Sequence, residues 1–147
     1  MLPRRSRWAR LRCVRGQEER RTIGDLLARA RSRYRRLSPV EAHTAARDGA
    51  IVVDTRCREA LDGDGRIPGA LHVPLSVLPW RADPDSPHRD ERIARLDARL
   101  ILVCAHGFSS SMAVASLLDL GFSQVTDIDG GFEAWSVAGL PVTHADH

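Results

Sequence analysis

The sequence predicts an α/β domain built on a mostly parallel central sheet, with helices on both of its faces. Short apolar runs rich in β-branched residues alternate along the chain with longer segments of helical periodicity. Each run is too short for a helix and is apolar throughout, which is typical of a strand covered on both faces. A chain of 147 residues with 43% hydrophobic content is sufficient for one such domain and too short for two.

Composition excludes several protein classes. No apolar run approaches the roughly 20 residues of a spanning helix, and the N-terminal residues lack the apolar region of a secretory signal. We therefore expect a soluble, cytoplasmic protein with no membrane partner. Cys13, Cys57 and Cys104 form no CxxC pair and no zinc-ligand spacing, which argues against a disulfide framework and a bound metal. The two histidines of the tail at 144–147 lack a third ligand.

Charge separates the N-terminal residues from the rest of the chain. Residues 1–36 hold 13 arginines against three acidic residues, a net charge of +10, whereas residues 37–147 carry −7. The chain contains no lysine, a bias more typical of a GC-rich genome than of selection for phosphate binding. We expect residues 1–21 to be a disordered basic extension, either a solvated arm or the product of an upstream start codon, and not a nucleic-acid site.

An amphipathic helix is predicted over residues 22–37. Thr22 and Asp25 have the spacing of a capping box. The residues that fall on one helical face are Ile23, Leu26, Leu27, Ala30 and Tyr34. We expect this face to pack on the domain or on a protein partner.

The central part of the chain begins with a clearly marked helix and strand. Ser38, Pro39 and Glu41 form a capping box with proline at the first helical position, which predicts a helix over 39–48. The apolar run 50–53 is the first predicted strand. A glycine-rich loop at 62–69 leads into a second strand at 70–73. Because that loop precedes a strand and does not open a helix, it is not a nucleotide-binding loop.

The same alternation continues through the second half of the chain. An irregular segment from Pro74 to about residue 90 precedes a short helix near 90–96 and a third strand at 100–103. A helix over 109–120, ended by Gly121, precedes the fourth strand at 125–128. A last helix opens at residues 130–131 and ends at Gly139.

Cys104 lies where the third strand ends and a helix begins. The first turn of a helix has unpaired backbone N–H groups and the positive end of the dipole, which together lower the pKa of a thiol. Gly107 lets the intervening loop turn inward. In parallel sheets, sites form beyond the carboxyl ends of the strands, and Asp54 follows the first strand in the same way. Cys104 and Asp54 share one rim if their strands are neighbours.

Four motifs, taken in order, resemble the rhodanese family over residues 38–142. They are Ile51-Val52-Val53-Asp54-Thr55-Arg56, Ile67-Pro68-Gly69-Ala70, the run from Val103 to Ser110, and Asp129-Gly130-Gly131-Phe132. The loop Cys-x-His-Gly-x-Ser looks most like that of single-domain thiosulfate sulfurtransferases. The resemblance implies a rhodanese domain over 38–143 that moves a sulfane sulfur from an anionic, thiosulfate-like donor to cyanide or a thiol. It implies a cysteine persulfide and no metal or organic cofactor.

Site residues follow from the resemblance by position. Cys104 matches the sulfur-carrying cysteine, and the loop whose amides surround it is Ala105, His106, Gly107, Phe108 and Ser109. Ser110 matches the residue that starts the next helix, and Asp54 and Arg56 match the family's Asp-x-Arg. Position 109 is serine where many members have arginine, so Arg58 is a candidate for donor binding. Arg66 stands where most members have histidine.

Several alternatives stay open at this point. His106 either influences the thiolate or is an exposed loop residue, and Cys57 is either a resolving thiol or a spectator. A phosphatase or arsenate reductase of the related fold requires arginine at position 110, where this chain has serine. A non-enzymatic sulfur carrier or protein-interaction module, binding through the N-terminal helix, is the remaining alternative.

Overall fold

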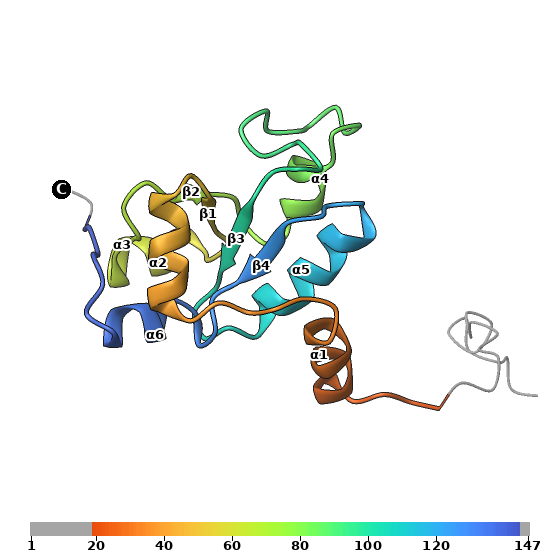
Figure 1. Ribbon diagram of the computed structural model, residues 1–147, viewed down its shortest axis with the longest axis horizontal. Coiled ribbons are helices and arrows are strands. Elements are labelled where there is room, and N and C mark those ends of the chain that lie inside the picture. Colours follow the sequence, from red (N-terminus) through yellow and green to blue (C-terminus); the bar gives the residue numbers. More distant parts are fainter. Residues whose placement is uncertain (1–18, 145–147) are drawn as a thin grey trace, which may run out of the picture.

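A computed structural model describes residues 19–144 as a four-stranded parallel sheet between helices (Figure 1). The strands are β1 (Ile51–Asp54), β2 (Leu71–His72), β3 (Leu100–Val103) and β4 (Val125–Asp127), in the order β2-β1-β3-β4. Both the α/β class and the parallel sheet are confirmed. The predicted basic extension lies almost entirely outside the described residues, as do Cys13 and the last three residues of the tail.

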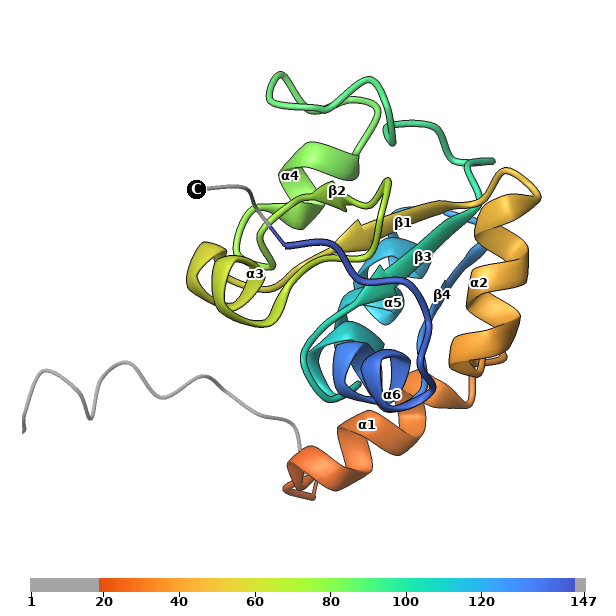
Figure 2. The ribbon, with the colours of Figure 1, turned by 90° about the vertical axis from the view of Figure 1, so that its left-hand side faces the viewer.

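Helices lie against both faces of the sheet (Figure 2), and each face has its own hydrophobic core. Val53, Leu100 and Leu102 face the core formed with α4 (Leu78–Ala82) and α5 (Ser109–Asp119). The intervening side chains, Ile101 and Val103 among them, face α2 (Pro39–Arg47) and α6 (Gly131–Val137). All of β3 is buried, which explains why its sequence is apolar without alternation.

The register of the sheet brings the strand ends to one rim. Ile51 pairs with Leu100, and Asp54 with Val103, so β1 and β3 are neighbours as the shared rim required. On the other side of β3, Leu102 pairs with Asp127 at the end of β4. Cys104 therefore emerges between the ends of two strands that each finish on an aspartate.

The structure corrects the helix predictions in the middle of the chain. Helix α3 (Arg58–Asp64) occupies the first part of the predicted glycine-rich loop, and α4 interrupts the segment predicted to be irregular. The helix predicted near 90–96 is wrong, because this segment forms turns. The Asp90 carboxylate accepts hydrogen bonds from the backbone N–H and guanidinium of Arg92, and the Asp90 carbonyl accepts from the N–H of Ala94, as at the start of a helix. The pattern stops after this turn, because the N–H of Arg95 donates to the carbonyl of Ile93.

The N-terminal helix is shorter than the sequence predicts. Helix α1 (Ile23–Arg31) begins with the expected capping box and packs on α5 (Figure 1). It ends at Arg31, and the chain then runs beside β4, where the N–H of Leu37 donates to the carbonyl of Asp127. The predicted apolar face is only partly covered, since Ile23 is 67% exposed. Within residues 19–144, none of the helices has the length and apolar character needed to span a bilayer.

Candidate active site

The sulfur of Cys104 lies in a cradle of hydrogen-bond donors. The thiol is buried, with 5% of the residue exposed. The backbone N–H groups of Gly107 and Ser110 donate to Sγ, at 3.1 and 3.4 Å, and the hydroxyl oxygen of Ser110 lies 3.2 Å from it. These groups come from the tight loop and from the first turn of α5, so chain direction and loop geometry together point them at one atom.

This cradle favours the ionised sulfur. Burial by itself raises the pKa of the Cys104 thiol, because it disfavours the charged form. Hydrogen bonds from the hydroxyls of Ser110 and Ser109 and from the backbone N–H groups of Ser110 and Gly107 outweigh burial. The net result is a pKa of Cys104 below its ordinary value, as expected for a nucleophilic thiol.

The start of helix α6 holds the first residues of the loop, Cys104 and Ala105, by backbone hydrogen bonds. The N–H of Phe132 donates to the carbonyl of Cys104 at 2.8 Å, and the N–H of Glu133 to that of Ala105 at 3.1 Å. Gly131 has φ +65°, and a Cβ there would lie 2.5 Å from the carbonyl oxygen of Cys104. Glycine at this position allows the helix start to approach the loop backbone closely enough for those hydrogen bonds.

Asp54 and Arg56 form a buried ion pair on the β1 side of Cys104. The Asp54 carboxylate accepts from Nη2 of Arg56 at 2.8 Å and from the backbone N–H of Arg56 at 3.0 Å. Nη2 of Arg56 also donates to the carbonyl of Gly65. Among the described residues its Nη1 has no hydrogen-bond partner, and the guanidinium stacks 3.8 Å above the Phe132 ring.

Asp127 is the corresponding aspartate on the β4 side, and it was not among the predicted site residues. Its side chain is fully buried and accepts five hydrogen bonds. The donors are the Tyr34 hydroxyl, Nε and Nη2 of Arg36, and the hydroxyls of Ser110 and Ser111. An acidic residue at the end of a buried strand was the available signal, the same signal that singled out Asp54.

Two arginines from the N-terminal segment contact the loop directly. Nη2 of Arg31 donates to the carbonyl of Gly107 at 2.7 Å, and Nη2 of Arg36 donates to the same oxygen at 2.8 Å. Burial lowers the pKa of Arg36, but the hydrogen bonds and charge of Asp127 outweigh burial and raise it. Arg36 therefore stays charged. Burial raises the pKa of Tyr34, so its hydroxyl keeps the proton that it donates.

Other predicted residues lie at the rim and do not contact the sulfur. Nδ1 of His106 is 2.6 Å from the Glu133 carboxylate and both side chains are exposed, which favours the exposed-loop interpretation. Arg58 is exposed at the start of α3 and forms no ion pair with any residue of 19–144. Phe108 is 60% exposed.

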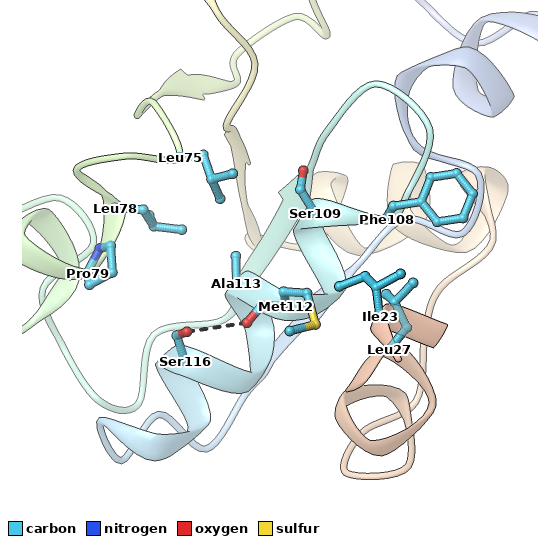
Figure 3. Close-up of a pocket in the computed structure, with 10 residues that line it drawn as sticks. All are labelled: Ile23, Leu27, Leu75, Leu78, Pro79, Phe108, Ser109, Met112, Ala113 and Ser116. Atoms are coloured by element: carbon cyan, nitrogen blue, oxygen red, sulfur yellow. Dashed lines mark hydrogen bonds between the residues drawn. The ribbon is translucent and has the colours of Figure 1, made fainter. Parts of the chain in front are cut away.

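An apolar groove of about 450 Å³ adjoins the loop (Figure 3). Its walls come from α1, from α4 and from the start of α5, and Phe108 and Ser109 place the loop at its edge. The groove lining consists of Ile23, Leu27, Leu75, Leu78, Pro79, Phe108, Ser109, Met112, Ala113 and Ser116.

Cys57 is a free, exposed thiol that precedes α3, and Cys104 is also free. Within residues 19–144, no group of three or more His, Cys, Asp or Glu side chains is arranged to hold a metal ion.

Comparison with known proteins agrees with this geometry. The rhodanese-like domain model matches residues 38–138. Curated relatives named thiosulfate sulfurtransferase GlpE include that of Pseudomonas entomophila, 42% identical over 71% of this chain and 86% of its own length. That of Ectopseudomonas mendocina is 40% identical, with the same coverage.

A solved structure from Rhodopseudomonas palustris is also similar. It is a protein of unknown function described as a possible tyrosine phosphatase, 30% identical, with a TM-score of 0.78. The match covers 88% of this chain and 99% of that one. Taken together, the curated relatives support sulfurtransferase activity in general, and the chain belongs to the rhodanese-like family.

Proposed function

We propose that this protein is a sulfurtransferase that carries a sulfane sulfur as a persulfide on Cys104. The donor is a small anion of the thiosulfate type, and the acceptor is cyanide or a thiol. The observation that carries the proposal is the buried Cys104 sulfur on which the N–H groups of Gly107 and Ser110 converge, in a cradle that lowers its pKa. The names of the curated relatives support the same donor class.

The reaction divides into two displacements at sulfur. In the first, the Cys104 thiolate attacks the outer sulfur of the donor, the sulfur–sulfur bond of thiosulfate breaks, and sulfite leaves with the bonding electron pair. In the second, the carbon of cyanide attacks the outer sulfur of the persulfide. Thiocyanate leaves, and the electron pair returns to Cys104 as a thiolate. A thiolate acceptor would take the same sulfur and become a persulfide itself.

The cradle suits a persulfide better than a phosphate. A terminal persulfide sulfur bears about one negative charge near neutral pH, which converging N–H groups stabilise without a cation. A phosphoryl group bears more charge, and position 110, where related phosphatases have arginine, is a serine that donates to the buried Asp127 carboxylate at 2.7 Å. We therefore do not extend the description of the R. palustris protein to this chain.

A non-enzymatic interaction module is the alternative function. The N-terminal helix, which would supply the docking surface, already packs on α5, and its last residue, Arg31, binds the catalytic loop. That engagement within the chain favours the enzymatic proposal over a free docking helix.

The first prediction tests the nucleophile. Cys104→Ala should abolish thiocyanate formation from thiosulfate and cyanide, while Cys57→Ser should leave it unchanged because Cys57 is outside the cradle. Thermal unfolding of both variants should match the wild type closely enough to show an intact fold. Treatment with thiosulfate alone should add about 32 Da to the Cys104 peptide, the mass of one sulfur. Turnover by Cys104→Ala would contradict the proposal.

A further inference from the structure

We propose that Arg31, Tyr34 and Arg36, here called the N-terminal clamp, are positioning residues of the catalytic centre that promote ionisation of Cys104. The inference rests on the proposed function only in taking Cys104 as the nucleophile. All three residues precede residue 38, where the match to the family domain begins. The clamp is thus an addition to the domain, and its contacts reach both the loop and Asp127.

The backbone of the clamp is fixed along β4. The carbonyl of Arg35 accepts from the Thr126 hydroxyl at 2.7 Å, and the N–H of Asp129 donates to the carbonyl of Leu37 at 2.8 Å. Arg36 lies between these two attachment points. Its side chain, only 17% exposed, therefore has a defined path to the loop, unlike that of an arginine on a free tail.

The clamp acts first on the Gly107 peptide. Two cationic donors, from Arg31 and Arg36, hold the Gly107 carbonyl at 2.7 and 2.8 Å, and each charge-assisted bond is stronger than a neutral one. Gly107 is held with φ +81°, and its own N–H donates to Sγ. The carbonyl belongs to the peptide between Gly107 and Phe108, whereas the N–H that donates to Sγ belongs to the preceding peptide, so the arginines act on this donor through the backbone angles of Gly107. Loss of the clamp frees those angles, which glycine constrains least, and lets the Gly107 N–H turn away from the thiolate.

The clamp acts second on Asp127. The Ser110 hydroxyl oxygen lies between Asp127 Oδ2, at 2.7 Å, and Cys104 Sγ, at 3.2 Å, and its single proton can serve only one of them. Tyr34, Arg36 and Ser111 provide four other hydrogen bonds to Asp127. The carboxylate is therefore satisfied without Ser110, whose proton is free to turn to the thiolate.

Arg36 also offsets a charge that opposes the thiolate. An uncompensated carboxylate one hydroxyl away from Sγ disfavours a second negative charge there. The charged and titratable groups around the loop are Arg31, Tyr34 and Arg36 from the clamp, Asp127 and Asp129 from the β4 side, Glu133 with His106 from the α6 side, and the Asp54–Arg56 pair from the β1 side. Asp54 already has its own cation, so Asp127 is the buried carboxylate that depends on the clamp.

The experiment measures ionisation of Cys104 and does not depend on turnover. The rate of Cys104 alkylation by iodoacetamide is followed against pH in the full chain by peptide mass spectrometry, and its midpoint reports the thiolate. Arg36→Gln should raise the midpoint by about one pH unit. This corresponds to about ten-fold less Cys104 thiolate at neutral pH. Arg36→Lys keeps the positive charge but not the planar guanidinium, so its midpoint should lie between those of the wild type and Arg36→Gln.

Arg33→Gln is the matched control. Arg33 belongs to the same segment and binds Asp119 of α5 at 2.8 Å, away from the loop. It should leave the midpoint where the wild type has it. An unchanged midpoint in Arg36→Gln, or an equal shift in Arg33→Gln, would overturn the clamp.

Tyr34→Phe keeps the proposal testable if Arg36→Gln does not fold. It removes one hydrogen bond to Asp127 and no volume from the core, so a smaller upward shift is expected and no shift would refute the clamp. The two proposals also fail separately. A wild type that transfers no sulfur but has a clamp-dependent midpoint would refute the proposed function alone.

Discussion

Two arginine–aspartate pairs flank Cys104, one buried and one partly buried, and they differ in where the arginine comes from. On the β1 side, Asp54 pairs with Arg56, two residues along the chain. On the β4 side, Asp127 pairs with Arg36, which is 91 residues away. The first arginine makes its other contacts with Gly65 and Phe132, whereas the second binds the carbonyl of Gly107 in the loop after Cys104.

The difference shows how one kind of ion pair can serve two purposes. A pair formed inside a single turn makes its hydrogen bonds locally and stabilises the carboxyl end of its own strand, β1. A pair formed between distant segments also holds those segments together. Here it holds the N-terminal clamp against β4 and the loop around Cys104. We therefore expect loss of the Asp54 pair to affect folding stability, and loss of the Asp127 pair to affect the thiol.

The largest effect is expected at Asp54. Asp54→Ala leaves the Arg56 guanidinium buried and without its carboxylate, which should cost about 3–5 kcal/mol of the free energy of unfolding. Asp90 and Arg92 provide a matched control, because they repeat the same spacing and the same side-chain and backbone hydrogen bonds at the surface. Asp90→Ala should cost less than about 1 kcal/mol. Urea unfolding measures both, and equal losses would mean that burial does not distinguish the pairs.

An intermediate effect is expected at Gly131. This residue starts α6, which contacts Arg56 of the Asp54 pair through Phe132 and packs against the loop after Cys104. A Cβ there meets the Cys104 carbonyl oxygen at 2.5 Å and the Gly107 nitrogen at 2.7 Å, so Gly131→Ala must displace the loop. We expect at least about ten-fold lower sulfurtransferase activity and a loss of about 2 kcal/mol of stability.

Gly139 is the control for that substitution. It also has positive φ, +73°, but a Cβ there meets no atom within 4 Å. Gly139→Ala should cost only the conformational penalty of about 1 kcal/mol and leave activity per folded molecule unchanged. If both variants kept full activity, close contact between α6 and the loop would not matter for catalysis.

The smallest effect is expected at Asp127, where the direction in which the alkylation midpoint of Cys104 moves is more informative than its size. Asp127→Asn removes the negative charge near Cys104 while the clamp arginines remain, so the alkylation midpoint of Cys104 should fall, by about one pH unit or less. Arg36→Gln should move it upward. Opposite shifts from the two partners of one ion pair indicate electrostatic control. Upward shifts in both would indicate that each variant merely loosens the loop.

Local signals in the sequence predicted most of the architecture. The capping boxes at Thr22 and Ser38 are both formed, because each depends on side chains three residues apart. The four strands lie where apolar runs predicted them, and Cys104 lies at the turn into α5 as expected. The helix predicted near 90–96 was wrong because the helical pattern that starts at Asp90 stops after one turn, where the N–H of Arg95 donates to the carbonyl of Ile93.

The sequence by itself determined the alternation of strands and helices, the position of Cys104 at a strand end and the family resemblance. Each of these depends on residues close together in the chain. Only the tertiary structure decided that Asp127, Arg31 and Arg36 belong to the same centre, since Arg31 and Arg36 reach Gly107 across 76 and 71 residues. Hydrogen bonds over such separations follow from packing α1 on α5 and the clamp on β4, which no local pattern encodes.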